Sequence, residues 1–121
     1  MRVIEINQAN IDSFNVIYDA VTKHENAGGV SGLTKIVKLL DKFDAIAVLG
    51  ENDIYSLRDK EQTYNLFLED DEWTSIKGWF DTVKWHPMKA RGIKKAYDLV
   101  ESAKEHKLEI VKETPKNEEK K

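Results

Sequence analysis

The chain has 121 residues, 40% of them hydrophobic and 34% charged, which is typical of one globular domain with its own core. It contains no cysteine, which excludes disulfides and thiolate metal sites. A net charge of −3 argues against a general nucleic-acid binder and against an acidic mimic of DNA. The opening residues MRVIEINQ lack the apolar stretch of a secretory signal, and no run is long enough to span a membrane. We therefore expect a cytoplasmic protein.

The first third of the chain predicts one strand and two helices. Residues 2–6 (RVIEI) alternate and are rich in β-branched side chains, as in a short strand. We expect Asn10 to cap a helix that ends near residues 26–29 and has an apolar stripe of Ile11, Phe14, Ile17, Tyr18 and Val21. We expect Ser31 to cap a second helix that buries Leu33, Ile36, Val37, Leu40 and Phe43. The glycine loop at 28–32 lacks the Lys-Ser/Thr ending of a P-loop, so we interpret it as a connection.

The middle of the chain predicts strands. Residues 45–49 (AIAVL) form an apolar run closed by Gly50, and residues 54–57 and 64–68 are weaker candidates separated by a polar turn. Segments this close in sequence are expected to pair as an antiparallel meander of two or three strands.

Two further helices are predicted after residue 68. The acids at 69–72 suit a helix N-terminus, and the apolar stripe that follows comprises Trp73, Ile76, Trp79, Phe80 and Val83. Pro87 should end this helix at about Lys84 or Trp85. A fourth helix is predicted from near Gly92 to about His106, with its buried side formed by Ile93, Ala96, Tyr97, Val100 and Ala103. Residues 108–111 (LEIV) should form a last strand.

The predicted fold class is α+β, with the order β-α-α-β-β-β-α-α-β in a single domain over residues 1–111. A mostly antiparallel sheet of three to five short strands should carry about four packed helices. Residues 112–121 have no apolar side chain to bury, so we expect a disordered charged tail.

No motif for catalysis or metal binding stands out. The three histidines lie far apart, and His24 and His106 are expected to be exposed residues at helix ends. The acidic residues lack calcium-loop spacing, and no serine lies in a nucleophile elbow. We therefore assign no catalytic residue, metal ligand or cofactor, and a small enzyme with carboxylate or histidine chemistry is the least supported function.

The segment WFDTVKWHP at 79–87 leads to the best candidate for a binding site. Continuing the helix through Trp85 would place it opposite the buried stripe, and residues 84–95 carry five bases and no acid. The acidic residues at 69–72 lie close in sequence and could neutralise this basic segment. The candidate binding residues are Trp85, His86, Lys89, Arg91, Lys94 and Lys95. The alternative is that Trp85 packs where the chain folds back and the lysines are simply solvated.

We expect a small non-catalytic protein that docks on another macromolecule, most simply a protein with an acidic surface. Short, cysteine-free domains rich in Lys, Asn and Ile are common among regulators and inhibitors encoded by phages and other mobile elements, an association that agrees with this expectation. The alternative is a nucleic-acid-binding accessory protein that uses residues 84–95, with phosphate on the lysines and a base stacked on Trp85. Only three of the 19 basic residues are arginine, which argues against base-specific reading. The sequence leaves the oligomeric state open.

Overall fold

The computed structural model describes residues 1–24 and 29–105, and over these residues the predicted α+β class and element order are confirmed. The strands are β1 (Arg2–Ile6), β2 (Ala47–Leu49), β3 (Tyr55–Leu57), β4 (Tyr64–Leu68) and β5 (Lys104–Glu105). The helices are α1 (Ile11–Lys23), α2 (Gly29–Ile46), α3 (Asp70–Thr82) and α4 (Ala90–Glu101). Short 3₁₀ turns are η1 (Glu51–Asp53) and η2 (Pro87–Lys89). The predicted strand at 108–111 and the tail at 112–121 lie outside the described residues.

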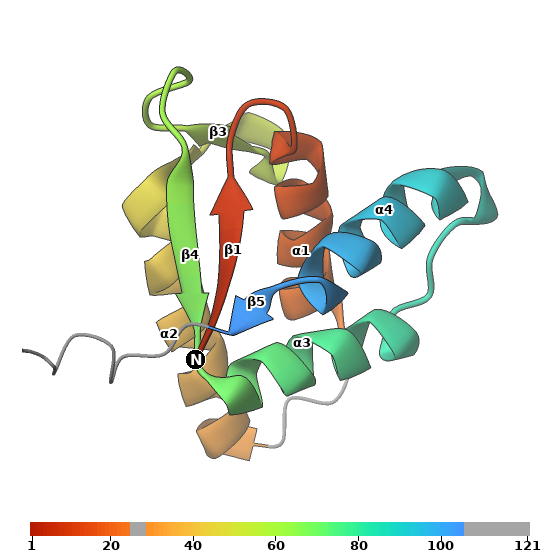
Figure 1. The fold of residues 1–121 in the computed structure, drawn as a ribbon. Helices are drawn as coiled ribbons and strands as arrows, with labels where there is room; N and C mark the ends of the chain where they lie inside the picture. The colour runs from red at the N-terminus through yellow and green to blue at the C-terminus, as the bar shows by residue number, and fades with distance from the viewer. Residues whose placement is uncertain (25–28, 106–121) are drawn as a thin grey trace, which may run out of the picture.

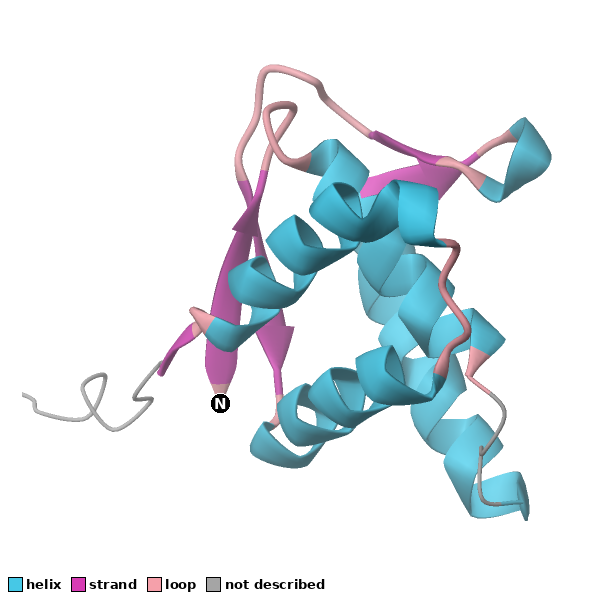
Figure 2. Ribbon diagram, turned by 90° about the vertical axis from the view of Figure 1, so that its right-hand side faces the viewer, coloured by secondary structure: helices cyan, strands magenta, loops and turns pink. Residues whose placement is uncertain are grey.

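The strands form two sheets rather than the expected single one. One has the order β4-β1-β5, and the other is the β2–β3 hairpin, with all pairs antiparallel. The helices lie on one side of the three-stranded sheet, and no helix within residues 1–24 and 29–105 covers its other face (Figure 1, Figure 2). The predicted meander is therefore wrong in one pairing, since β4 pairs with β1 and not with β3.

The alternation of inward and outward side chains along β1 and β4 explains why these two strands pair. Ile4 and Leu66 are partners in the register and are both buried, facing the helices. Val3 and Phe67 are partners on the opposite face, where Phe67 is 37% exposed. Because side chains alternate between the faces, this register places every large aliphatic residue of the two inward rows in the core.

The core lies between the sheet and the helices, with α1 at its centre. Phe14 and Ile17 of α1 are fully buried, and α1 packs against α3, α4 and β3. The expected Asn10 cap is not made. Its side chain instead accepts from the Asn7 N–H at 2.8 Å and donates to the Glu5 carbonyl at 2.8 Å, which holds the β1–α1 turn.

Helix α2 departs most from its prediction. It begins at Gly29, so Ser31 lies inside it, and it continues through Ala45 and Ile46, which were assigned to a strand. Its buried residues are Leu39, Phe43 and Ile46, whereas Leu33 and Val37 of the predicted stripe are 54% and 55% exposed. The apolar residues of α2 form an arc, and the helix packs through the edge of that arc that holds Leu39 and Ile46, while the opposite edge stays exposed.

Two helix ends also fall earlier than expected. Helix α1 ends at Lys23, and the predicted stop at residues 26–29 lies mostly outside the described residues. Helix α4 ends at Glu101 rather than near His106, and the chain turns at Ser102 into β5. Ala103 nevertheless remains buried, as the stripe predicted.

Candidate functional site

The corner between α3 and α4, defined as residues 83–95, is shaped by local backbone rules. Helix α3 ends at Thr82, and Val83 is extended. Pro87 holds His86 extended and begins η2 at a position where no N–H is needed. The Nδ1 atom of His86 accepts from the Met88 N–H at 3.2 Å and so caps η2. The break at Pro87 was predicted, although α3 ends two residues before the earliest expected position.

Trp85 is half-buried and belongs partly to the fold. Its indole N–H donates to the Phe80 carbonyl at 2.8 Å, and its ring centre lies 5.7 Å from that of Phe80. The helical angle used to place Trp85 opposite the core does not apply, because α3 has already ended three residues earlier. The chain folds back at Trp85, which agrees with the alternative in which Trp85 packs between the two helices.

Two grooves flank Trp85. The first, of about 520 Å³, lies between α3 and α4 and is here called the α3 groove; its apolar lining comprises Phe80, Trp85, Pro87, Ala90, Ile93 and Tyr97. The second, of about 410 Å³, lies between α1 and the start of α4 and is here called the α1 groove; it is lined by Val16, Asp19, Lys23, Val83, Lys84, Trp85, His86, Lys89, Gly92 and Ile93. The grooves share Trp85, His86 and Ile93, which form the ridge between them.

The basic residues of the corner divide between these surfaces. Lys89 lines the α1 groove, and Lys94 lines the α3 groove. Arg91 and Lys95 lie with Lys94 on the solvent side of α4, and both are exposed. The structure therefore brings all six predicted binding residues to one corner but distributes them around the first turns of α4. Met88, which sequence analysis did not select, is 89% exposed at the tip.

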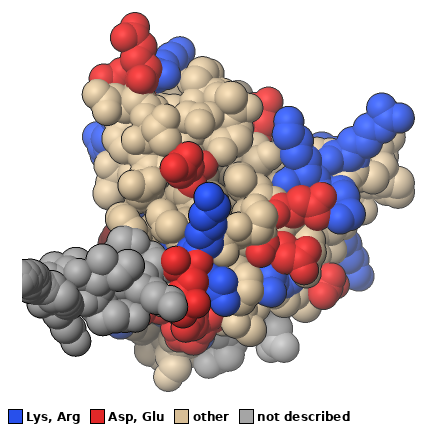
Figure 3. Space-filling model, in the orientation of Figure 1, with Lys and Arg blue, Asp and Glu red and all other residues tan. Residues whose placement is uncertain are grey.

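Most of the positive charge of the corner is not neutralised within the described part of the chain. Lys94 bonds to Asp98 at 2.6 Å, and this hydrogen bond and ion pair raise the pKa of Lys94. Across residues 1–24 and 29–105, no ion pair is formed by Lys84, Lys89, Arg91 or Lys95. In Figure 3 the blue side chains at the right gather around the start of α4, with red ones bordering them.

The acidic segment 69–72 does not neutralise the corner. Asp70 pairs with the N-terminal ammonium at 3.0 Å, and Asp71 pairs with Lys35 at 3.5 Å. Glu72 is 5% exposed and accepts from Lys42 at 2.6 Å, while it also completes the capping box of α3. These acids hold α3 to α2 and β1, so the basic charge of the corner remains available to a ligand.

His24 corrects another expectation. It was expected to be exposed at the end of α1 but is only 8% exposed. Its ring stacks on Trp79 with centres 4.1 Å apart, and its Nδ1 atom lies 3.1 Å from the Ala20 carbonyl oxygen. Trp79 is therefore a partly buried residue that packs against His24, and the periodicity of the sequence did not reveal this contact. His106 lies outside the described residues.

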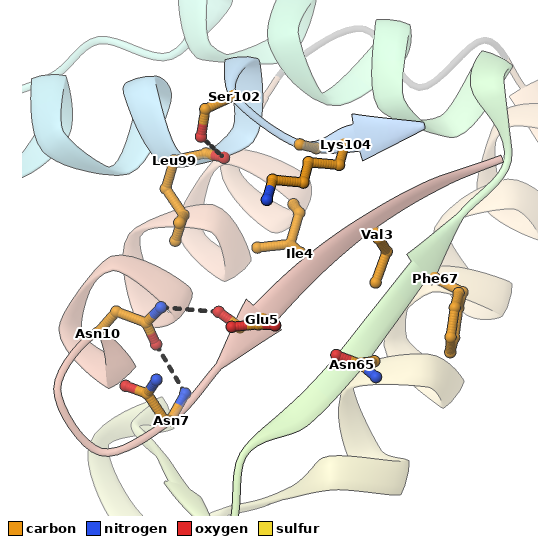
Figure 4. Close-up of a pocket in the computed structure, with 11 residues that line it drawn as sticks. Val3, Ile4, Glu5, Asn7, Asn10, Asn65, Phe67, Leu99, Ser102 and Lys104 are labelled. Atoms are coloured by element: carbon orange, nitrogen blue, oxygen red, sulfur yellow. Dashed lines mark hydrogen bonds between the residues drawn. The ribbon is translucent and has the colours of Figure 1, made fainter. Parts of the chain in front are cut away.

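A further depression runs along the part of β1 that β5 does not cover (Figure 4). Glu5, Asn65 and Phe67 lie on its sheet side, and the end of α4 closes it. The side chain of Asn10 points into this region, but its oxygen and nitrogen are both used within the β1–α1 turn. The Asn10 side chain in this depression therefore serves the β1–α1 turn.

Comparison with protein-family models, with curated proteins and with solved structures finds no match. Within the described ranges, no helix has the length and apolar character needed to cross a membrane. Over the same residues, no group of three or more histidine or acidic side chains could hold a metal ion.

Proposed function

We propose that this protein is a non-catalytic cytoplasmic regulator or inhibitor that acts by docking on another protein through the corner at residues 83–95. The observation that carries the proposal is a set of unpaired basic side chains at the corner that also holds the apolar α3 groove. Lys84, Lys89, Arg91 and Lys95 have no ion-pair partner in the described structure; Lys84 and Lys89 line the α1 groove, and Arg91 and Lys95 lie on the solvent side of α4. Phe80 and Tyr97 line the neighbouring α3 groove. An apolar centre with a charged rim is the arrangement typical of protein interfaces.

The position of Trp85 favours a protein over a nucleic acid. Stacking of a base would rest mainly on Trp85, which is half-buried, packs against Phe80 and uses its N–H inside the fold. A protein partner needs only an apolar ridge, which Trp85 and Ile93 provide between the grooves. The basic residues then attract an acidic surface and increase the rate of association.

The test compares two charge reversals of equal size. Lys89→Glu with Lys95→Glu reverses charge at the corner, and Lys38→Glu with Lys60→Glu reverses charge at two exposed sites elsewhere. Each variant is used to capture partners from the source cells, and the captured protein is then purified and titrated. We expect the corner variant to bind at least about tenfold more weakly than the control variant. Equal binding by both variants would remove the corner from consideration.

Salt dependence separates this proposal from nucleic-acid binding. Phosphate contacts release condensed counterions, so the affinity of a nucleic-acid complex falls steeply as salt is raised. We expect a shallower dependence for a protein partner, carried mainly by the association rate. Retention of nucleic acid with a steep salt dependence, instead of a protein, would contradict the proposal.

A further inference from the structure

The two grooves at the corner differ in chemistry, although they share one ridge. The floor of the α3 groove is aromatic, formed by Phe80, Trp85 and Tyr97, and its charged lining residues are Asp81 and Lys94, which is paired with Asp98. The α1 groove contains three lysines, of which only Lys23 has an ion-pair partner, Asp19 at 3.5 Å. One groove thus suits a large apolar side chain, and the other suits an anion.

Gly92 leaves the α1 groove open. It lies in the first turn of α4, and a Cβ atom built on it would have no neighbour within 4 Å. Because Gly92 also lines the groove, the space beside its backbone is accessible to a ligand. A Cβ atom added at this position would therefore not clash with another part of the fold.

His86 adds a hydrogen-bond donor on the ridge. Its Nδ1 atom accepts from the Met88 N–H, so the neutral ring carries its proton on Nε2. The residue is exposed, and its Nε2–H can therefore donate outward to an oxygen atom. Together with Lys84 and Lys89, it provides the recognition that a carboxylate requires.

We propose that the partner binds through a short acidic segment that places an aromatic or large aliphatic side chain in the α3 groove and a neighbouring carboxylate in the α1 groove. The segment crosses the ridge of Trp85, His86 and Ile93. This inference rests on the proposed docking function and specifies the chemistry of the partner. The occupant is expected to be acidic, because Lys84 and Lys89 lack ion-pair partners within residues 1–24 and 29–105 and attract negative charge.

The test uses blocked synthetic peptides and the full chain. The probe is Glu-Glu-Phe-Glu-Glu; one control peptide replaces its phenylalanine with alanine, and the other replaces its glutamates with lysines. Binding is followed by NMR through the Trp85 indole N–H and the Gly92 amide. We expect the probe to shift both signals and each control peptide to bind at least about tenfold more weakly. Absence of shifts at about 2 mM probe, or equal binding of all three peptides, would overturn the inference.

Two glycine variants provide a matched pair for the groove itself. Gly92→Phe places a large side chain on the lining of the α1 groove, whereas Gly78→Phe adds the same side chain to α3 at a position that also has open space around it. We expect Gly92→Phe to weaken probe binding at least about tenfold and Gly78→Phe to leave it unchanged. Gly92→Ala, which leaves most of the groove empty, should bind like the parent. Equal binding by the two phenylalanine variants would show that the α1 groove is not used.

The same variants separate this inference from the docking function. If Lys89→Glu with Lys95→Glu releases the purified partner while Gly92→Phe does not, docking at the corner stands and the carboxylate subsite is wrong. If neither variant affects the partner, both proposals fail. A short single-stranded oligonucleotide that shifts the same signals more strongly than the peptide would also overturn the acidic-segment assignment.

Discussion

Replacing Trp85 with alanine measures how much this residue contributes to the stability of the fold. Its indole donates one hydrogen bond of 2.8 Å, and its ring centre lies 5.7 Å from that of Phe80. Such a hydrogen bond and such an aromatic pair contribute about 1 kcal/mol each. Truncation of a fully buried tryptophan costs about 3–5 kcal/mol. Because Trp85 is partly exposed, we expect Trp85→Ala to lower the free energy of unfolding by about 2–3 kcal/mol.

The assay is urea denaturation followed by circular dichroism, with two companion variants. Trp85→Phe keeps a ring on Phe80 but loses the hydrogen bond, so it should cost about 1 kcal/mol. Met88→Ala alters a large hydrophobic residue of the same corner that is 89% exposed, and it should change stability by less than about 0.5 kcal/mol. A Trp85→Ala protein as stable as the parent would refute the packing described here. Loss of more than about 5 kcal/mol would make Trp85 a core residue and remove it from the binding ridge.

Four other substitutions test the packing by the same denaturation assay. Phe80 is 4% exposed, and Phe80→Ala should cost about 3–5 kcal/mol; a nearly neutral result would contradict the register of α3. Leu39→Ala should lower the free energy of unfolding by about 2–5 kcal/mol because Leu39 is fully buried. Leu33→Ala should lower it by less than about 1 kcal/mol because Leu33 is 54% exposed. A larger loss for Leu33→Ala than for Leu39→Ala would support the buried stripe expected from sequence. Burial and the hydrogen bond to Asp44 raise the pKa of Tyr55, so the unfolded chain loses this proton first and stability should fall above about pH 10. Tyr55→Phe should flatten that alkaline decline, and an unchanged slope between about pH 9 and 11 would contradict this assignment.

The elements with a narrow apolar pattern were predicted well from sequence. Residues 2–6 were predicted to form a strand, and β1 occupies these residues. The stripe of α3 likewise identified Ile76 and Phe80 as buried. The local pattern therefore placed both elements, and in α3 it also identified most of the packed face.

Prediction failed where tertiary contacts choose among equivalent local options. The apolar residues of α2 span an arc of about 180°, so periodicity could not show that Leu39 would pack while Val37 stays exposed. The apolar alternation of β4 similarly fits either β1 or β3 as a partner. At the corner, the basic residues were selected from sequence, but the α1 groove depends on Val16, which is distant in the chain.

The place of β1 in the sheet has a consequence for the order of folding. The first strand of the chain lies at the centre of the sheet, where Arg2 is opposite both Leu68 and Glu105. In contrast, the β2–β3 hairpin joins residues as close as Leu49 and Tyr55. Closing the β1–β4 loop instead of that hairpin corresponds to roughly three doublings of loop length, or about 2 kcal/mol of chain entropy. During synthesis, β1 must therefore wait until β4 has emerged, and the hairpin and its neighbouring helices can collapse before the central sheet is assembled.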